Sequence, residues 1–238
     1  MRILGIDSST PGCSVALLNN DTVVADQIAD PQPSHSKYLL QMVDHVLKEG
    51  NVCLNDIDGF AVTLGPGSFT GLRVGVSLLK GFVLATEKPF VGINSLEALA
   101  ATVDSPLHPV CATLDARKSE VYAAVFEPHP EGLRPALPES ALPPEALSEH
   151  INGPTLFTGS GVERYIQILK ETLGSRFLTP EAPALFSTAA SAAKLAQPRL
   201  ETQKQFDLSQ LHINYIRKSE AELSLGISLA ERRLHNGN

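Results

Sequence analysis

Four polar residues, Asp7-Ser8-Ser9-Thr10, follow the first apolar run of the chain at a point where a strand is expected to end. A carboxylate followed by hydroxyl side chains in a tight turn can present backbone N–H groups and hydroxyls to a phosphate or to its bound metal. The same residues also suit a structural turn, in which Asp7 caps the turn and the hydroxyls bond to its backbone. The motif is short, so the sequence leaves both interpretations open.

A glycine-rich stretch lies between an apolar run and a helical pattern, Thr63-Leu-Gly-Pro-Gly-Ser-Phe-Thr-Gly-Leu-Arg-Val-Gly75. The N-terminus of a helix after such a turn can hold an anion with its free N–H groups. The stretch is not a P-loop, because the spacing G-x-x-x-x-G-K-[ST] is absent. Gly71 and Gly75 are four residues apart and share one helix face, which lets another backbone approach closely. Spacing alone does not say whether that neighbour belongs to the same chain or to a partner.

Other catalytic motifs are absent from the sequence. No G-x-S-x-G elbow and no H-E-x-x-H helix occurs, and Cys13, Cys53 and Cys111 lie far apart without a C-x-x-C pair. We therefore expect no catalytic residue, no metal site and no disulfide. The cysteine usage fits a reducing cytoplasm.

Composition and charge limit the possible functions. Hydrophobic residues make up 43% of the 238, which excludes a disordered chain. The 19 basic and 26 acidic residues give a net charge of −7, which disfavours unaided binding to a nucleic-acid backbone. The longest apolar stretch, residues 72–85, is interrupted by Arg73 and Lys80 and is too short to span a bilayer, so no membrane segment is expected.

The hydrophobic pattern of the first half predicts three strands that form an antiparallel meander, followed by alternating helices and strands. Asn19-Asn20-Asp21 suits the tight turn between the second and third strands. The expected strands are 2–7, 13–18, 22–28, 59–63 and 90–93, and the expected helices are 34–48, 70–85 and one from 95.

The second half repeats this order after Pro106 and Pro109. Strands are expected at 110–115, 120–126 and 155–158, a weaker third strand within the proline-rich stretch 128–144, and helices at 162–173 and 187–196. The repetition predicts a duplicated α/β unit, with one lobe at residues 1–108 and a second at 109–218. The tail 219–238 is expected to be helical, because Leu223, Ile227, Ala230 and Leu234 recur at helical spacing.

The stretch from Thr63 to Gly75 resembles, almost letter for letter, the hallmark of the bacterial TsaB (YeaZ) family. The likeness extends to Leu4–Ser9, Ser34–Ser36, Leu114–Arg117 with Glu120–Tyr122, and Tyr215–Arg217. It implies a duplicated actin-like (ASKHA, ribonuclease-H-like) α/β fold with two lobes, each a mixed sheet flanked by helices. It further implies a part in making threonylcarbamoyladenosine next to the anticodon of tRNA.

Within that system the related protein TsaD carries the transfer chemistry, and two histidines four apart on a helix hold its metal. Here Ser95 and Leu99 stand at the corresponding positions, with Glu97 retained between them. His35 does not restore the pattern, because the residue four positions ahead is Leu39. The resemblance therefore implies a non-catalytic subunit that binds TsaD and supports its activity.

The resemblance places the contact with TsaD on the first-lobe helices 34–48 and 70–85, and a homodimer on the same surface when TsaD is absent. The ATPase TsaE is expected to join the complex, and tRNA to be reached only through it. ATP or ADP with Mg is expected only in the assembled complex, and no cofactor in this chain alone. The candidate partner-binding residues are His35, Leu39, Met42, Ser68, Phe69, Thr70, Gly71, Arg73, Val74, Gly75 and Leu78.

Three alternatives remain. One is an actin-like ATPase or kinase that uses Asp7 near a metal-bound phosphate, and another is a metal-independent peptidase-like protein. A direct tRNA-binding module fits less well, since aromatic residues are 5% of the chain and tryptophan is missing. Gly159-Ser-Gly161 resembles the glycine turn that faces a nucleotide base in actin-like folds, and it also suits an ordinary strand-to-helix turn. The candidate nucleotide-facing residues are Asp7, Ser8, Ser9, Asp115, Gly159 and Gly161.

Overall fold

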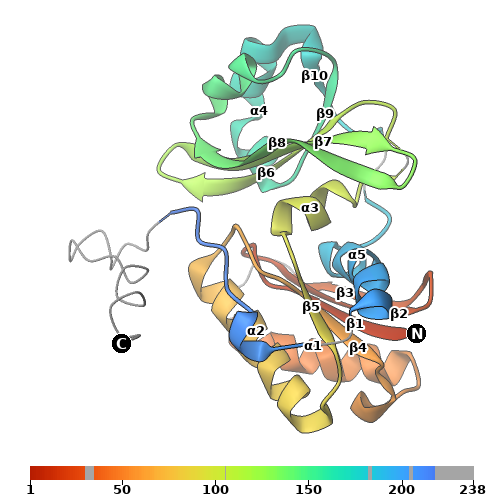
Figure 1. The fold of residues 1–238 in the computed structure, drawn as a ribbon. Coiled ribbons are helices and arrows are strands. Elements are labelled where there is room, and N and C mark those ends of the chain that lie inside the picture. The colour runs from red at the N-terminus through yellow and green to blue at the C-terminus, as the bar shows by residue number, and fades with distance from the viewer. Residues whose placement is uncertain (30–34, 105, 182–183, 204–205, 218–238) are drawn as a thin grey trace, which may run out of the picture.

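The chain forms two lobes that repeat one strand order (Figure 1). A computed structural model describes residues 1–29, 35–104, 106–181, 184–203 and 206–217. At residues 35–37 it describes the backbone alone. The sheets run β3-β2-β1-β4-β5 and β10-β9-β6-β7-β8, so each first-lobe strand has a counterpart at the same place in the second sheet. The predicted duplicated α/β fold with two mixed sheets is confirmed.

The first sheet combines an antiparallel meander with two parallel strands, as the sequence pattern predicts. Strand β1 pairs antiparallel with β2 and parallel with β4, and β4 pairs parallel with β5. Asn20 adopts a left-handed conformation, with φ of 53°, in the turn between β2 and β3. The strands are β1 (Arg2–Asp7), β2 (Cys13–Asn19), β3 (Thr22–Ala29), β4 (Gly59–Thr63) and β5 (Phe90–Ile93).

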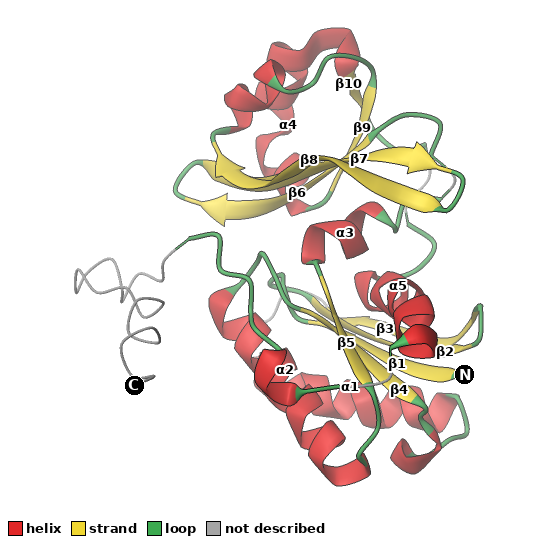
Figure 2. Ribbon diagram, in the orientation of Figure 1, coloured by secondary structure: helices red, strands yellow, loops and turns green. Residues whose placement is uncertain are grey.

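Helices α1 (His35–Glu49) and α2 (Phe69–Thr86) cover one face of the first sheet, and the short helix η1 (Leu54–Asp56) joins α1 to β4 (Figure 2). The Ser68 side chain caps α2 by accepting a hydrogen bond from the Gly71 N–H. Leu39, Val46 and Leu79 belong to the apolar core between these helices and the sheet. Burial of this core fixes where the glycine-rich stretch lies relative to β1.

The second sheet holds one strand that is longer than the sequence pattern predicts. Strand β8 fills most of the proline-rich stretch and pairs with β7. It is an edge strand, where a proline that lacks an N–H is tolerated, which explains how Pro135 and Pro138 fit within it. The elements are β6 (Val110–Arg117), β7 (Glu120–His129), β8 (Gly132–Leu142), η2 (Pro144–Glu149), β9 (Thr155–Thr158), α4 (Ser160–Leu173), η3 (Gly174–Arg176) and β10 (Phe177–Leu178).

Two helices are exchanged between the halves of the sequence. Helix α3 (Ser95–Ala100) belongs to the first half, yet its Leu96 and Ala100 pack in the core under the second sheet. Helix α5 (Thr188–Thr202) belongs to the second half, yet its buried alanines pack on the first sheet. Figure 1 shows both helices between the two sheets. The strands of the first sheet all precede residue 108 and those of the second sheet all follow it, whereas α3 and α5 each pack with the other half of the sequence.

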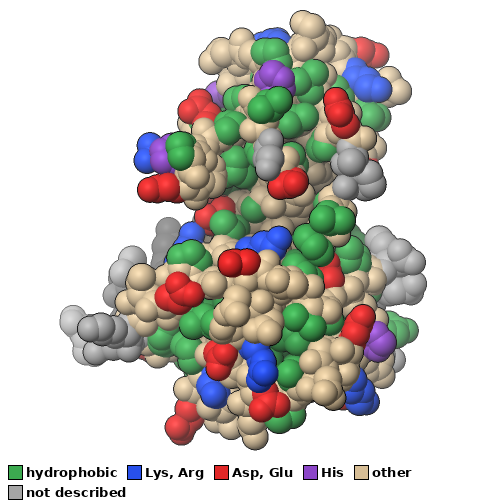
Figure 3. All heavy atoms as spheres, turned by 90° about the vertical axis from the view of Figure 1, so that its right-hand side faces the viewer, with side chains coloured by type: hydrophobic (Ala, Val, Ile, Leu, Met, Phe, Trp, Pro, Cys, Tyr) green, Lys and Arg blue, Asp and Glu red, His purple; other side chains and the backbone are tan. Residues whose placement is uncertain are grey.

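The last described segment also returns to the first lobe. After α5, the short helix η4 (Leu208–Gln210) packs near the end of α2, and residues 211–217 lead toward the second lobe (Figure 1). Helix α5 continues past its predicted end at residue 196 through Pro198, which is exposed. The predicted tail helix at 219–238 lies outside the described residues. Figure 3 shows the two lobes as separate masses joined by a narrower region.

Helix α2 is the one described helix that is long and apolar enough to cross a membrane, with 18 residues and a mean hydropathy of 1.3. One face of it packs on the first sheet, as in the core helix of a globular protein. On its other side, within the part of the chain that the structure describes, Thr70, Ser77, Gly81, Leu84 and Ala85 are exposed, and Val74 and Leu78 are partly buried.

Candidate functional site

The turn after β1 is built from side chains that bond to one another. Asp7 is 3% exposed, and its Oδ1 accepts hydrogen bonds from the Thr63 hydroxyl at 2.6 Å and from the Ser9 N–H at 3.0 Å. The Ser8 hydroxyl donates to the Gly71 carbonyl at 2.9 Å. These bonds agree with the structural-turn interpretation of the motif.

The glycine-rich stretch packs directly on this turn. The Ser68 N–H donates to the Ser9 carbonyl at 2.6 Å. A Cβ at Gly71 would overlap the Ser8 carbonyl oxygen, and a Cβ at Gly75 would overlap the Ser8 hydroxyl. Both glycines therefore permit a close approach within the chain. The expectation that they open the helix to a partner is corrected, because the neighbour that needs their missing side chains is the β1–β2 turn.

The second lobe repeats this arrangement around Asp115. Its carboxylate pairs with Arg164 at 3.3 Å and accepts hydrogen bonds from the Arg117 N–H at 2.9 Å and the Tyr165 hydroxyl at 3.4 Å. Gly159 and Gly161 lie against Thr113, much as Gly71 and Gly75 lie against Ser8. The candidate nucleotide-facing residues of both lobes thus have partners within the chain.

The positions that correspond to metal ligands also serve the fold. The Ser95 hydroxyl is buried and accepts a hydrogen bond from the Gly65 N–H at 3.0 Å. Leu99 contacts Gly159, and Glu97 forms an ion pair with Arg199 at 3.1 Å. Among the described residues, no group of three His, Cys, Asp or Glu side chains lies close enough to hold a metal ion.

The predicted partner-binding residues divide by exposure. Leu39, Met42, Gly71 and Gly75 are buried within the lobe, which removes them from any surface in this conformation. Ser68, Phe69, Val74 and Leu78 are partly buried, and Thr70 and Arg73 are exposed. His35 begins α1, and its side chain is outside the description.

The outer face of α2 carries four residues that the sequence analysis did not name, Ser77, Gly81, Leu84 and Ala85, beside the predicted Thr70, Val74 and Leu78. Gly81 has nothing within 4 Å of the position a Cβ would take, and Leu84 is 74% exposed. Residues three and four apart share one face of a helix, and this spacing identifies the residues of α2 that face away from the sheet. The sequence already held that signal, because apolar and small residues also recur at helical spacing outside the buried positions of α2. We call this set the α2 outer face: Thr70, Val74, Ser77, Leu78, Gly81, Leu84 and Ala85.

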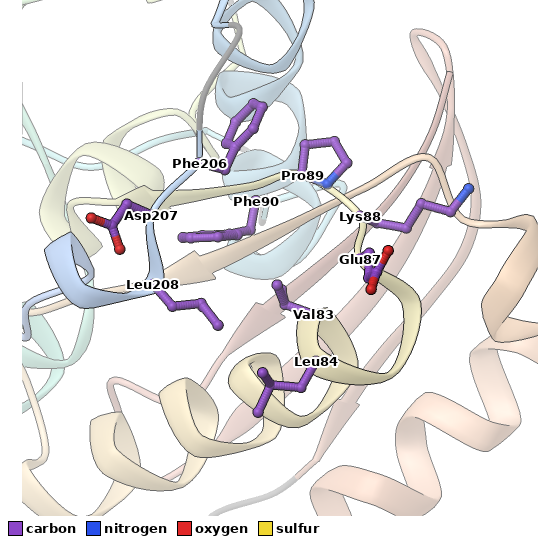
Figure 4. A pocket seen from close by; sticks show the side chains of 9 residues that line it. All are labelled: Val83, Leu84, Glu87, Lys88, Pro89, Phe90, Phe206, Asp207 and Leu208. Atoms are coloured by element: carbon purple, nitrogen blue, oxygen red, sulfur yellow. The ribbon is translucent and has the colours of Figure 1, made fainter.

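A cavity of about 570 Å³ lies at the C-terminal end of α2, next to this face (Figure 4). Val83, Phe90, Phe206 and Leu208 supply apolar walls, and the charged side chains of Glu87, Lys88 and Asp207 also line the cavity. Leu84 belongs both to this lining and to the α2 outer face. The apolar surface therefore continues past the end of the helix.

An aromatic and cationic cluster lies at the N-terminal end of α2. The Phe69 ring packs on Tyr215 with 4.7 Å between the ring centroids, and the Arg73 guanidinium lies 3.8 Å from the Phe69 centroid. The Arg73 Nε donates to the Tyr215 hydroxyl at 3.1 Å. Two residues of the hallmark stretch thus contact the Tyr215-Ile216-Arg217 segment, which sequence alone did not connect.

Two lobes that repeat one strand order, each with a polar turn braced by a glycine-rich helix start, define a protein of the actin-like class. In fold alone the chain is similar to component A of (R)-2-hydroxyglutaryl-CoA dehydratase from Acidaminococcus fermentans, with a TM-score of 0.53, 13% identity, and 85% of this chain and 100% of that one covered. The sequence model described as "TsaD: tRNA N6-adenosine threonylcarbamoyltransferase" matches residues 23–225. The chain belongs to that broad family and, within it, to the TsaB (YeaZ) family.

Individual relatives support this assignment. The chain is 35% identical over 178 residues to the tRNA threonylcarbamoyladenosine biosynthesis protein TsaB of Escherichia coli (strain K12), which covers 72% of this chain and 77% of the relative. It is similar in structure to YeaZ from Pseudomonas aeruginosa, with a TM-score of 0.71, 28% identity, and 90% and 99% of the two chains covered. A tRNA N6-adenosine threonylcarbamoyltransferase of Ehrlichia chaffeensis is 35% identical over 116 residues, which are 42% of this chain and 33% of the transferase.

Proposed function

We propose that this chain is a non-catalytic cytoplasmic subunit for the threonylcarbamoyl modification of tRNA adenosine next to the anticodon. It acts by binding a TsaD-type transferase through the α2 outer face. The observation that carries the proposal is the exposure of this face. An 18-residue helix of mean hydropathy 1.3 presents the 74% exposed Leu84 beside an open Gly81, and Val74 and Leu78 are partly exposed next to them. Such a surface on a single chain marks an interaction site.

The identity of the partner follows from relatedness. The TsaB relatives are named for the biosynthesis of threonylcarbamoyladenosine. The related transferases are similar to this chain over a little less than half of its length. Two chains with the same lobe can pair through equivalent helices around a pseudo-twofold axis. The same geometry supports a homodimer when the transferase is absent, since this chain would then supply both halves of the interface.

The hydrogen bonds and ion pairs within the chain favour a non-catalytic, accessory role. Asp7, Ser8 and Asp115, which would face a nucleotide in an enzyme of this fold, bond to neighbouring residues of the chain. We propose that a TsaE-type ATPase brings ATP or ADP to the assembled complex. Basic and acidic side chains are interspersed on the face in Figure 3, and the net charge is −7, so we propose that tRNA is reached through the partners.

A binding experiment with matched variants tests the docking surface. The transferase of the same organism is titrated into the wild-type chain, into Gly81→Arg, and into Gly153→Arg, whose glycine also faces open space but lies in the second lobe. We expect Gly81→Arg to weaken binding by at least about 100-fold and Gly153→Arg by less than about twofold, since only the first places a long charged side chain in the helix contact. Wild-type affinity of a folded Gly81→Arg chain contradicts the surface.

A second pair of variants uses exposed leucines. Leu84 on the α2 outer face is 74% exposed, and Leu107 in the connection between the lobes is 92% exposed. Leu84→Glu is expected to lose the transferase and the tRNA modification in a reconstituted reaction, whereas Leu107→Glu keeps both. Calorimetry with Mg-ATP on the isolated chain addresses the enzyme alternative: micromolar binding with turnover contradicts the accessory role.

A further inference from the structure

Residues 211–217 form an extended segment, here called the strap, that leaves the first lobe and reaches the second (Figure 1). Leu211 is 9% exposed and lies in the first-lobe core, and Ile213 packs against the same core. The Asn214 N–H donates to the Leu64 carbonyl at 2.7 Å. The start of the strap is therefore a fixed part of the first lobe.

The strap is held a second time at α2. The Tyr215 ring packs against Phe69 at a tilt of 31°, and its hydroxyl accepts a hydrogen bond from the Arg73 Nε at 3.1 Å. A packed aromatic pair with a charge-assisted hydrogen bond fixes both the position and the direction of the chain at residue 215. The next two residues are thereby aimed at the second lobe.

Glu139, in the second half of β8, contacts the strap on the second lobe. One carboxylate oxygen accepts a hydrogen bond from the Asn214 side-chain amide, and the other accepts one from the Asn94 side-chain amide. Asn94 is also the cap of α3, and its Oδ1 accepts from the Leu96 N–H at 2.8 Å and the Glu97 N–H at 3.2 Å. One carboxylate thus connects the second sheet, the strap and α3.

Arg217 makes the other contact with the second lobe. Its Nη1 donates to the Ala116 carbonyl at 3.1 Å and pairs with the Glu120 carboxylate at 2.9 Å. These two acceptors flank the β6–β7 turn, in which Arg117, Lys118 and Ser119 take left-handed conformations with φ of 59°, 53° and 61°. Three successive non-glycine residues in this region are strained, and Arg217 bridges the two ends of the strained turn.

The lobes also meet through α3, a helix of six residues with apolar contacts on the second sheet. Apolar contacts have no directional preference, so a short helix alone leaves the lobes free to rock about it. We propose that the strap fixes the angle between the lobes, with α3 as the pivot and Glu139 and Arg217 as the locking contacts. This inference does not depend on the proposed function.

Spin labels on each lobe test the proposal. Cys53 is the exposed native thiol of the first lobe, whereas Cys13 and Cys111 are buried, and Ser175→Cys adds an exposed thiol to the second lobe. The interlobe distance distribution is measured by pulsed electron resonance on the full chain with and without Glu139→Ala plus Arg217→Ala. We expect the distribution to be at least twice as broad in the double variant.

Matched controls separate a loss of the lock from general loosening. Glu131→Ala plus Arg134→Ala removes the same two residue types from exposed sites on the second lobe, and we expect it to keep the wild-type width. If Glu139→Ala plus Arg217→Ala does not fold, Glu139→Gln replaces it. This variant keeps one acceptor oxygen, so we expect it to broaden the interlobe distance distribution by a smaller factor. A wild-type distribution in the folded strap variants overturns the proposal, because α3 would then be sufficient.

Discussion

The Cα of Gly75 faces the hydroxyl of Ser8, and a Cβ at residue 75 would overlap that oxygen. One turn earlier, the same Ser8 hydroxyl donates to the Gly71 carbonyl at 2.9 Å. Gly71 and Gly75, the two glycines of the hallmark stretch that lie in α2, therefore let this helix pack on the β1–β2 turn. They set the position of the helix, and the opposite side of that helix meets the surroundings.

Replacing Gly75 is predicted to damage the fold. Gly75→Leu forces a side chain into the space of Ser8 and is expected to lower the free energy of unfolding by about 3 kcal/mol. Gly81→Ala is the control, because its Cβ meets open space, and it is expected to raise that free energy by about 0.5 to 1 kcal/mol through helix propensity. Urea unfolding followed by circular dichroism measures both. Equal stability of the two variants would show that Gly75 does not face the turn.

Asp7 is predicted to matter for stability before any ligand is considered. Asp7→Ala leaves the buried Thr63 hydroxyl and the Ser9 N–H without their shared acceptor, and we expect a loss of about 2 to 3 kcal/mol. Asp7→Asn keeps an oxygen at the same place and is expected to lose about 1 kcal/mol or less. Thermal unfolding of the two variants checks the order. The reverse order, or no loss in either, would show that the carboxylate does not brace the turn.

Stability is predicted to fall in alkaline solution. Burial raises the pKa of the Cys111 thiol far above its ordinary value of 9.0, and burial, with the nearby Asp7 charge, also raises the pKa of Cys13. The folded state then keeps protons that the unfolded state releases, so the stabilisation is complete below pH 9 and is lost as the pH rises above it. Each fully shifted group contributes a slope of up to about 1.4 kcal/mol per pH unit.

The alkaline slope has a direct control. Denaturant unfolding between about pH 8 and pH 10 gives the slope for the wild-type chain, and Cys111→Ala removes its largest expected source. We expect the variant to be less stable at neutral pH, because it leaves a small cavity, but to show a flatter dependence above pH 9. A slope unchanged by the substitution would assign the alkaline loss to other groups.

The repeated order of strands and helices was predictable because apolar periodicity is a local property. Strand β8 was harder to predict, since prolines mark breaks in most contexts and are tolerated at a sheet edge, which is a property of the whole sheet. The continuation of α5 past Pro198 was hard to predict for a similar reason. Pro198 is exposed, so the backbone hydrogen bond that it cannot donate is missing on the side of the helix away from the sheet.

The glycines show how far the site could be predicted. Spacing correctly places Gly71 and Gly75 on one face of α2, but it contains no information on which neighbour fills that face. Gly81 lies on the open face of the same helix. Because it is also a glycine, only the position of the sheet distinguishes it from Gly71 and Gly75. The contact between Arg73 and Tyr215 spans 142 positions of the chain, and no local pattern reports a contact of that range.

The exchange of α3 and α5 bears on how such a protein can have arisen. Each sheet has one face covered by a helix that the other half of the sequence supplies, so a single repeat would leave an apolar face open. Two separate copies could close both faces only by trading those helices, in the manner of a domain-swapped dimer. The present chain has the architecture of such a dimer joined into one polypeptide, in which each half supplies a helix that covers the sheet of the other.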